Sequence, residues 1–360
     1  MLEHGICCRQ FDFKDINMQI GLIKKFLEEN KVPPYRLGQV MKAVYADSVD
    51  SFSDITTISK DLRQKMSAEV PLLSFEAEEI LASDTGESFK AGLRLAGGDY
   101  IETVLLKQKD SWSVCISSQV GCAMGCRFCA TGALGFKRNL TSEEITDQVL
   151  FWKQYMKKNN FENNLKSIVF MGMGEPMNNY KEVKRAIEIL TDENTFNFGM
   201  RHISVSTSGL PSGIKQLAKD FPQINLAISL IVADNAKRSE LMRVNERFDL
   251  GEIKKALDAY FKTTNRKVFL EYIMFKDYND SEADADNLAD FVKSNLRPDL
   301  LHVNLISYNT TSANFLPSDK AAVEKFKEYL GKKRISATIR KSLGEEIKAA
   351  CGQLAARKND

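Results

Sequence analysis

Hydrophobic residues recur at helical spacing through the first part of the chain. Ile20 and Ile23 begin one apolar stripe, and the two prolines at 33–34 separate it from a second helical pattern. Ser59 is placed to cap a third helix. We therefore expect a small helical accessory domain over residues 1–85.

The spacing of apolar residues changes to that of strands from Phe89 onward. Two strand patterns, 89–95 and 100–107, flank a turn at 97–99 that contains two glycines. This arrangement predicts a β-hairpin. We expect the hairpin to lead into a larger domain that spans residues 86–345.

Six further apolar runs of strand length alternate with helical patterns. They cover residues 114–118, 167–171, 202–206, 224–229, 268–274 and 301–306. Thr141 and Glu144 form a capping box before the first helix, and Asp249, Ser281 and Ser318 are candidate caps for later helices. Apolar strands joined by helices predict an α/β fold with a parallel sheet covered on both faces, here a partial (β/α)6 barrel. Ligands then bind at the carboxyl ends of the strands.

The composition is that of an ordinary globular protein, with 43% hydrophobic and 27% charged residues among 360. The longest apolar runs are far shorter than the roughly 20 residues that a membrane-spanning helix needs. The formal net charge of +2 is nearly balanced, so a nucleic-acid partner would be held by local basic patches. We expect a monomer in the cytoplasm that does not associate with membranes.

Three cysteines, Cys122, Cys126 and Cys129, follow the first expected barrel strand closely. A four-iron cluster normally takes four cysteines, so three leave one iron open to a ligand with amino and carboxylate groups, such as S-adenosylmethionine (SAM). A zinc knuckle and buried structural cysteines are the alternatives. Zinc would need a fourth Cys or His, and none follows Cys129 until His202. The spacing therefore favours a [4Fe-4S] cluster.

Together with these cysteines, five stretches make the sequence resemble the RlmN and Cfr family of radical SAM RNA adenine methyltransferases. They are residues 115–122, 135–141, 171–176, 206–209 and 349–354. The resemblance covers nearly the whole chain. It implies a radical SAM barrel, a [4Fe-4S] cluster, two SAM molecules per turnover and an RNA-binding role for the N-terminal helical domain.

The resemblance assigns the SAM pocket to successive strand ends. Gly174 and Glu175 follow the second barrel strand, where glycine lets the backbone approach a ligand closely. The other expected pocket residues are Ser206, Ser229, Leu230, Ile231 and Asn309. A glycine-rich turn after a strand is common, so each of these residues alone is weak evidence.

Three residues carry the chemistry that the resemblance implies. Cys351, in a C-terminal segment of residues 346–360 where we expect a short helix, matches the cysteine that carries the methyl group as a thioether. Cys115 matches a second, disulfide-forming cysteine, and Glu102 matches the glutamate that removes the ring proton. Without the resemblance, the cysteines would be packing residues and Glu102 a solvated strand residue.

The same resemblance implies 23S rRNA as substrate, tRNA as a further candidate, and an external electron donor such as flavodoxin or ferredoxin. Pro176 favours methylation of adenine carbon 2, as in RlmN. The alternatives are a Cfr-like methylation of carbon 8, which gives resistance to ribosome-targeting antibiotics, a radical enzyme with another substrate, and a non-catalytic RNA-binding protein with zinc. Ile231, Ser307 and Thr310 depart from the family pattern.

Candidate RNA phosphate contacts are basic residues, each of which alone would be an ordinary surface charge. They are Lys137, Arg138, Arg201, 332–334, Arg340 and Lys341. Cys7 and Cys8 match no motif and are given no role.

Overall fold

The computed structural model describes residues 19–162 and 164–355. The chain divides into two compact units, one ending at Ser74 and one beginning at Phe75. Cys7 and Cys8 lie outside the described residues.

The first unit is helical, as the apolar spacing predicts. Its elements are α1 (Gln19–Glu29), α2 (Tyr35–Met41), the π-helix η2 (Lys42–Ala46), the 3-10 helix η3 (Phe52–Asp54) and α3 (Lys60–Glu69). Ser59 caps α3, because its hydroxyl accepts a hydrogen bond from the backbone of Leu62. Ile23, Val44 and Met66 are completely buried and form part of its core.

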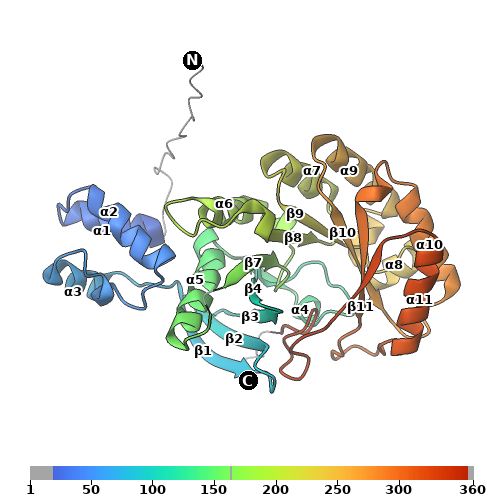
Figure 1. The fold of residues 1–360 in the computed structure, drawn as a ribbon, viewed down its shortest axis with the longest axis horizontal. Coiled ribbons are helices and arrows are strands. Elements are labelled where there is room, and N and C mark those ends of the chain that lie inside the picture. Colours follow the sequence, from blue (N-terminus) through green and yellow to red (C-terminus); the bar gives the residue numbers. More distant parts are fainter. Residues whose placement is uncertain (1–18, 163, 356–360) are drawn as a thin grey trace, which may run out of the picture. The chain divides into compact units, whose positions relative to one another are not determined.

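A ten-stranded mixed sheet organises the second unit (Figure 1). The strands in sheet order are β1 (Phe75–Ala82), β2 (Ser88–Leu95), β3 (Tyr100–Gln108), β4 (Ser111–Cys115), β7 (Leu165–Phe170), β8 (Ile203–Thr207), β9 (Asn225–Ser229), β10 (Val268–Met274), β11 (Leu301–Ser307) and β12 (Ala337–Arg340). The pairings from β1 to β4 are antiparallel, and those from β4 to β12 are parallel. The α/β fold, the hairpin and the six barrel strands are confirmed, and β12 adds a strand.

Strand β1 is where the sequence analysis is wrong, because it placed residues up to 85 in the helical part. Most of its residues are partly or fully exposed, and Glu76, Glu78 and Glu79 give it a polar character at the edge of the sheet. Such a strand lacks the apolar alternation that identifies a half-buried strand. The division between the units therefore lies before β1.

Helices connect the parallel strands, as Figure 1 shows. They are α5 (Ser142–Lys158), α6 (Tyr180–Thr191), α7 (Pro211–Asp220), α8 (Asn235–Leu241), α9 (Leu250–Thr263), α10 (Glu282–Lys293) and α11 (Lys320–Lys332). The capping box of Thr141 and Glu144 and the caps Asp249 and Ser281 are confirmed. Helix α11 begins one residue later than predicted, because the hydroxyl of Ser318 donates to Asp280 and leaves the N-cap position to Asp319.

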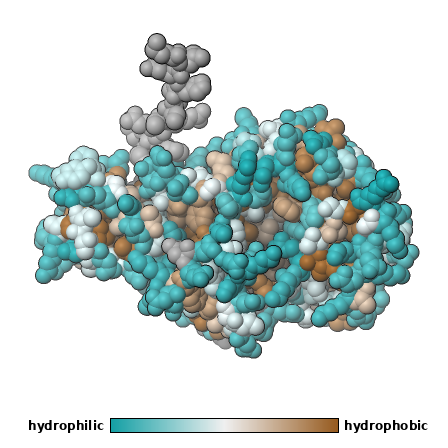
Figure 2. Space-filling view, viewed as in Figure 1, coloured by the Kyte–Doolittle hydropathy of each residue, from teal (hydrophilic) through white to brown (hydrophobic). Residues whose placement is uncertain are grey.

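In open α/β sheets, ligands bind at the carboxyl ends of the parallel strands, which is the edge that carries the expected site residues here. Side chains on the barrel strands are mostly buried, and Val205, Leu226 and Leu270 have no exposed surface. Within the described residues, no helix is both long and apolar enough to cross a membrane. Figure 2 shows a mostly hydrophilic face on which hydrophobic residues form only small patches.

Candidate active site

The loop that carries the three clustered cysteines connects β5 (Gln119–Gly121) to the short helix α4 (Ala130–Ala133). Strand β5 pairs with β6 (Phe136–Asn139) in a two-stranded sheet. Gly121 has a φ of +71°, and a Cβ there would collide with the carbonyl of Gly135. The amide of Cys122 donates to that carbonyl at 2.7 Å. The loop is therefore tightly fixed at its first cysteine.

The three thiols of this loop are half-buried and form no disulfide. Burial raises the pKa of Cys122 to about 12 and also raises that of Cys126, and negative charge on the neighbouring cysteines would raise both further. Thiolates crowded in this way require a compensating cationic group. An apolar cluster that includes Phe128 and Phe275 packs against Cys126 and Cys129 and shields this side of the loop from water.

The chemistry of the donor set fits an iron–sulfur cluster. A structural zinc ion takes four ligands at one point, with each sulfur at about 2.3 Å. In an iron–sulfur cluster each cysteine binds a different iron. The loop offers three free thiols, those of Cys122, Cys126 and Cys129, which is the donor set of a cluster with one iron left open.

The segment after β7 approaches this loop through two glycines. A Cβ on Gly172 would lie 2.7 Å from the carbonyl oxygen of Ile116, and one on Gly174, whose φ is +99°, would lie 2.5 Å from Gln119. Larger residues would push this turn away from the strand that leads to the cysteines. The glycines are thus needed for a close approach of two strand ends.

Glu175 is buried and acts on the backbone around it. Its carboxylate accepts hydrogen bonds from the amides of Met177 at 3.0 Å and Ser208 at 2.7 Å. Burial raises the pKa of this carboxyl, although these bonds oppose the shift. Glu175 therefore joins the ends of β7 and β8, which leaves the main chain around Gly174 as the surface available to a ligand.

The next strand ends continue the same edge. The hydroxyls of Ser206 and Ser229 lie 3.3 Å apart on β8 and β9, and Leu230 is completely buried. Ile231 has a φ of +69°, an unfavourable value for a β-branched residue. Its side chain packs in the apolar cluster with Phe128, so only its main chain is available to a polar ligand.

The C-terminal segment, residues 344–355, folds back onto the cysteine loop. The amide of Ala130 donates to the carbonyl of Gly352 at 2.8 Å, and Thr131 donates to that of Leu354 at 2.6 Å. From the other side, Asn309 donates to the carbonyl of Cys351 at 3.1 Å. Figure 1 shows this segment, in red, returning toward the strands near the start of the sheet.

The short helix expected around Cys351 is not present. The segment consists of turns, and Gly344, Lys348 and Gly352 all have positive φ values. An α-helix cannot continue through residues in the left-handed region. In these turns the carbonyl of Cys351 accepts from Asn309 and that of Gly352 from Ala130. An α-helix would instead pair such carbonyls with its own amides.

Cys351 is exposed to solvent, whereas Cys115 at the end of β4 is buried, and both are free thiols. The protein around Cys351 nevertheless raises the pKa of its thiol by burial, with further increases from the charges of Glu271 and Cys129. Negative charge on Cys351 in turn raises the pKa of Cys115, which places the two thiols near each other.

Glu102 on β3 is buried beside the same segment. Its carboxylate forms an ion pair with Lys90 on β2 at 3.0 Å and accepts a hydrogen bond from the amide of Ala355 at 2.7 Å. Burial raises the pKa of Glu102, and the nearby Lys90 and Ala355 oppose that rise. The residue is thus an integral part of the site and not the solvated strand residue that its position alone suggested.

Comparisons with known proteins agree with this arrangement. Residues 116–289 match the radical SAM superfamily, and residues 15–71 match the ribosomal RNA large subunit methyltransferase N-terminal domain. The ribosomal RNA large subunit methyltransferase Cfr of Clostridium botulinum strain Okra is 42% identical over 95% of this chain and 98% of its own. This chain belongs to the radical SAM ribosomal RNA methyltransferase family.

Other members of the family extend the match. The methyltransferase Cfr of Bacillus velezensis is 39% identical over 92% of this chain and 95% of its own length. A radical SAM methyltransferase from Sphaerobacter thermophilus, known from a crystal structure, is 38% identical over 94% of this chain and 97% of its own, with a TM-score of 0.87. Pro176 favours RlmN, whereas the two Cfr proteins are similar to nearly the whole chain, so the comparisons support the Cfr-like alternative better.

One residue of this family site has no sequence signal that identifies it. Arg238 on α8 is completely buried and donates to the carbonyls of Ser208 and Leu230 and to the side-chain oxygen of Asn245, at 2.7–2.9 Å. Burial lowers the pKa of Arg238 to about 10. It ties together the strand ends that carry the expected SAM pocket, yet in the sequence it is an ordinary basic residue of a polar helix.

Several of the candidate RNA contacts have partners inside the protein. Arg138 forms ion pairs with Asp99 at 2.5 Å and Glu144 at 2.8 Å, and Lys137 also pairs with Asp99. Burial raises the pKa of Glu271, and the charge of Arg340 opposes that rise. Lys137, Arg138 and Arg340 therefore interact with acidic groups of the protein itself.

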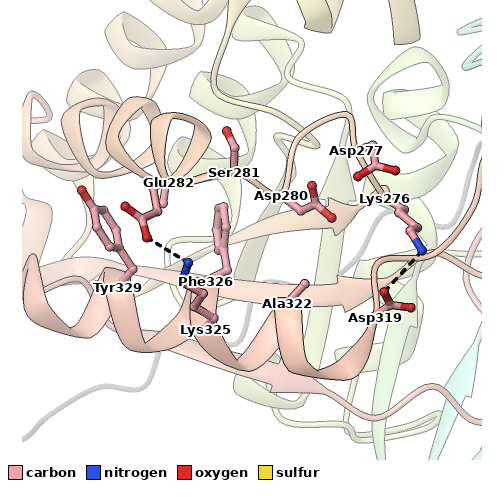
Figure 3. Close-up of a pocket in the computed structure, with 11 residues that line it drawn as sticks. Lys276, Asp277, Asp280, Ser281, Glu282, Asp319, Ala322, Lys325, Phe326 and Tyr329 are labelled. Atoms are coloured by element: carbon pink, nitrogen blue, oxygen red, sulfur yellow. Dashed lines mark hydrogen bonds and ion pairs between the residues drawn. The ribbon is translucent and has the colours of Figure 1, made fainter.

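A separate cavity of about 280 Å³ lies between α10 and α11, away from the cysteines. Figure 3 shows its lining, which includes Asp280, Glu282 and Lys325 and none of the expected site residues. Lys325 pairs with Glu282 at 3.1 Å across the opening.

Proposed function

We propose that this protein is a radical SAM methyltransferase that methylates carbon 8 of an adenine in 23S rRNA. The observation that carries the proposal is that Glu102, Cys115 and Cys351 come together beside the cysteine loop, at a place that we propose receives the adenine and that we call the recess. A structural zinc protein would have no need to bring these three groups together. Methylation at carbon 8 is supported by the similarity to Cfr proteins over nearly the whole chain.

The cofactors are assigned to the strand-end edge. Cys122, Cys126 and Cys129 would hold a [4Fe-4S] cluster, and SAM would take the iron left without a cysteine. The main chain at Gly174 and at 229–231, with Ser206 and Asn309, would contact SAM. When bound, the cluster and SAM supply the radical that removes a hydrogen atom from a methyl group. The apolar cluster around Phe128 limits access of water to this chemistry.

The chain's own residues perform the remaining steps. Cys351 carries the methyl group as a thioether, and its exposure in the recess allows an adenine ring to reach it. The unpaired electron that remains after the methylene carbon has joined the ring would return to the cluster, and Glu102 accepts the ring proton. The thiolate of Cys115 then attacks the sulfur of Cys351, which forms a disulfide and breaks the sulfur–carbon bond. The electron pair of that bond passes to the methylene carbon, which takes up a proton and becomes the methyl group of the released RNA.

The RNA and the electron donor are assigned by similarity. The N-terminal unit matches the family's N-terminal domain, and we assign it to binding the RNA. The target adenine must leave its stack to reach the recess, as in other enzymes that modify a base. An external donor such as flavodoxin or ferredoxin would reduce the cluster.

The position of the new methyl group is the test of this proposal. The purified, anaerobically reconstituted protein would be incubated with SAM, a reductant and unmodified 23S rRNA fragments, with tRNA in a parallel reaction. Chromatography of the digested nucleosides against standards separates 8-methyladenosine from 2-methyladenosine, which have equal mass. We expect 8-methyladenosine from rRNA, and none with Cys351→Ala. A product methylated only at carbon 2 would assign the protein to the RlmN activity instead.

A further inference from the structure

Lys90 is a buried charged residue to which no role has been assigned so far. It lies on β2 diagonally opposite Glu102 on β3, since Gly92 pairs with Glu102 and Lys90 with Val104 in the antiparallel register. The two side chains are only 11% and 7% exposed, and their charged atoms are 3.0 Å apart. Paired charges are seldom buried to this degree without a specific reason, because removing both from water is costly.

The same two residues hold both ends of the turn that carries Cys351. The ammonium of Lys90 donates to the carbonyl of Lys348 at 3.3 Å, which precedes the cysteine. The amide of Ala355, which follows the cysteine, donates to the carboxylate of Glu102 at 2.7 Å. Each carboxylate oxygen of Glu102 therefore has one donor, and the ion pair is connected to the chain on either side of Cys351.

We propose that Lys90 is a positioning residue of the methyl transfer, which keeps Glu102 ionised in the recess and fixes the Cys351 turn beside it. This inference rests on the proposed function, because it assigns Lys90 to the step in which Glu102 accepts the ring proton. In that step the carbon–hydrogen bond of the methylated ring carbon breaks, the proton passes to Glu102, and the electron pair stays in the ring.

The need for a cation here follows from the surroundings of Glu102. Burial raises the pKa of this carboxyl, and the charge of Glu79 on β1 raises it slightly more. Lys90 is the charged group that opposes both effects, with help from the Ala355 amide. Without Lys90, Glu102 would hold a proton over more of the working pH range and could not accept another.

Which oxygen of Glu102 accepts the ring proton depends on which of its two hydrogen-bond donors, Lys90 or Ala355, is held more firmly. Lys90 belongs to the middle of a three-stranded antiparallel arrangement, with β1 on one side and β3 on the other. Ala355 lies in the C-terminal segment, outside any helix or strand. The oxygen bonded to Ala355 is therefore the one that becomes free for the ring proton, while Lys90 keeps the carboxylate oriented.

The experiment compares Lys90→Met with Lys90→Arg and with Lys325→Met, which removes an exposed ion pair far from the site. Protein–RNA adduct formed in a single anaerobic turnover would be followed on denaturing gels between pH 6.5 and 9. We expect Lys90→Met to release the adduct at least tenfold more slowly than the parent, with the acidic limb of the profile moved to higher pH. Lys90→Arg should recover much of the rate, and Lys325→Met should match the parent.

A second measurement needs neither cluster nor RNA. Alkylation of Cys351 by iodoacetamide, mapped by mass spectrometry, should be severalfold faster in Lys90→Met because the turn has lost one anchor, while circular dichroism shows an unchanged fold. If Lys90→Met does not fold, Lys90→Gln serves in both assays. Adduct release and alkylation at parental rates would overturn the inference. If the parent makes no methylated adenine, the proposed function fails, and the alkylation rates alone then decide whether Lys90 holds the turn.

Discussion

The buried position of Cys115 predicts how the release of RNA depends on pH. Cys115 is 8% exposed at the end of β4, and burial raises its pKa above the ordinary range of a thiol. In the adduct Cys351 is a thioether without charge, so burial is the cause that remains. Only the thiolate attacks the sulfur of Cys351. At every pH in a practical assay, Cys115 is therefore mainly protonated, and the supply of thiolate limits the attack.

The magnitude follows from that protonation state. While the pH stays below the pKa, each added pH unit increases the thiolate fraction about tenfold. The adduct between Cys351 and RNA should therefore be released about tenfold faster at pH 8.5 than at pH 7.5. The sign is fixed, because raising the pH removes the proton that blocks the attack. Cys115→Ala should form the adduct and retain it at both pH values.

The assay is adduct decay on denaturing gels after a single anaerobic turnover with labelled rRNA fragments. Cys351→Ala is the matched control, because it removes the attachment site and should give no adduct at any pH. Mass spectrometry of Cys351 separates methylation of the cysteine from the later steps. A rate of release that does not change between pH 7.5 and 8.5, or prompt release by Cys115→Ala, would refute the assignment of Cys115.

Three further outcomes are expected. Replacing Cys122, Cys126 or Cys129 by Ala should abolish the cluster, so iron content and visible absorption should fall to background after anaerobic reconstitution. Arg238→Met should lower the free energy of unfolding by about 3–5 kcal/mol, because it leaves several buried acceptors without a donor; urea denaturation measures this, and a change below about 1 kcal/mol would contradict it. Ile231→His should cost about 1–3 kcal/mol in the same assay, because a polar ring enters an apolar cluster, and a stabilised variant would show that relief of backbone strain dominates.

The parallel part of the fold could be predicted because its strands are buried on both faces. Runs such as 268–274 and 301–306 are apolar almost throughout and flanked by capped helices, and β10 and β11 occupy those positions. Strand β12 could not be recognised in this way. It has four residues, none fully buried, and exists through its pairing with β11. Its sequence alone contains no period that distinguishes it from a loop.

The residues of the site likewise fall into two groups: those that a local sequence motif identifies, and those that only contacts between distant parts of the chain identify. The cysteine loop is a local motif, so its residues could be selected from their spacing alone. Lys90 and Arg238 depend on partners far away in the chain, such as Lys348 and Ser208. A basic residue that will be buried looks like a surface residue until the fold places carbonyl and carboxylate oxygens around it.

The antiparallel strands before the barrel have a specific consequence for the chemistry. A barrel of strands β4 to β12 could hold the cysteine loop and the SAM edge, but it contains neither Lys90 nor Glu102, which lie on β2 and β3. The C-terminal segment contacts both regions, through Ala130 and Asn309 near the loop and through the Lys90–Glu102 pair on the extension. The proposed proton acceptor, Glu102, is therefore brought to the proposed methyl carrier, Cys351, by an element outside the barrel. A change that loosens the extension should slow release of the adduct while leaving cluster assembly intact, because no cluster cysteine lies on those strands.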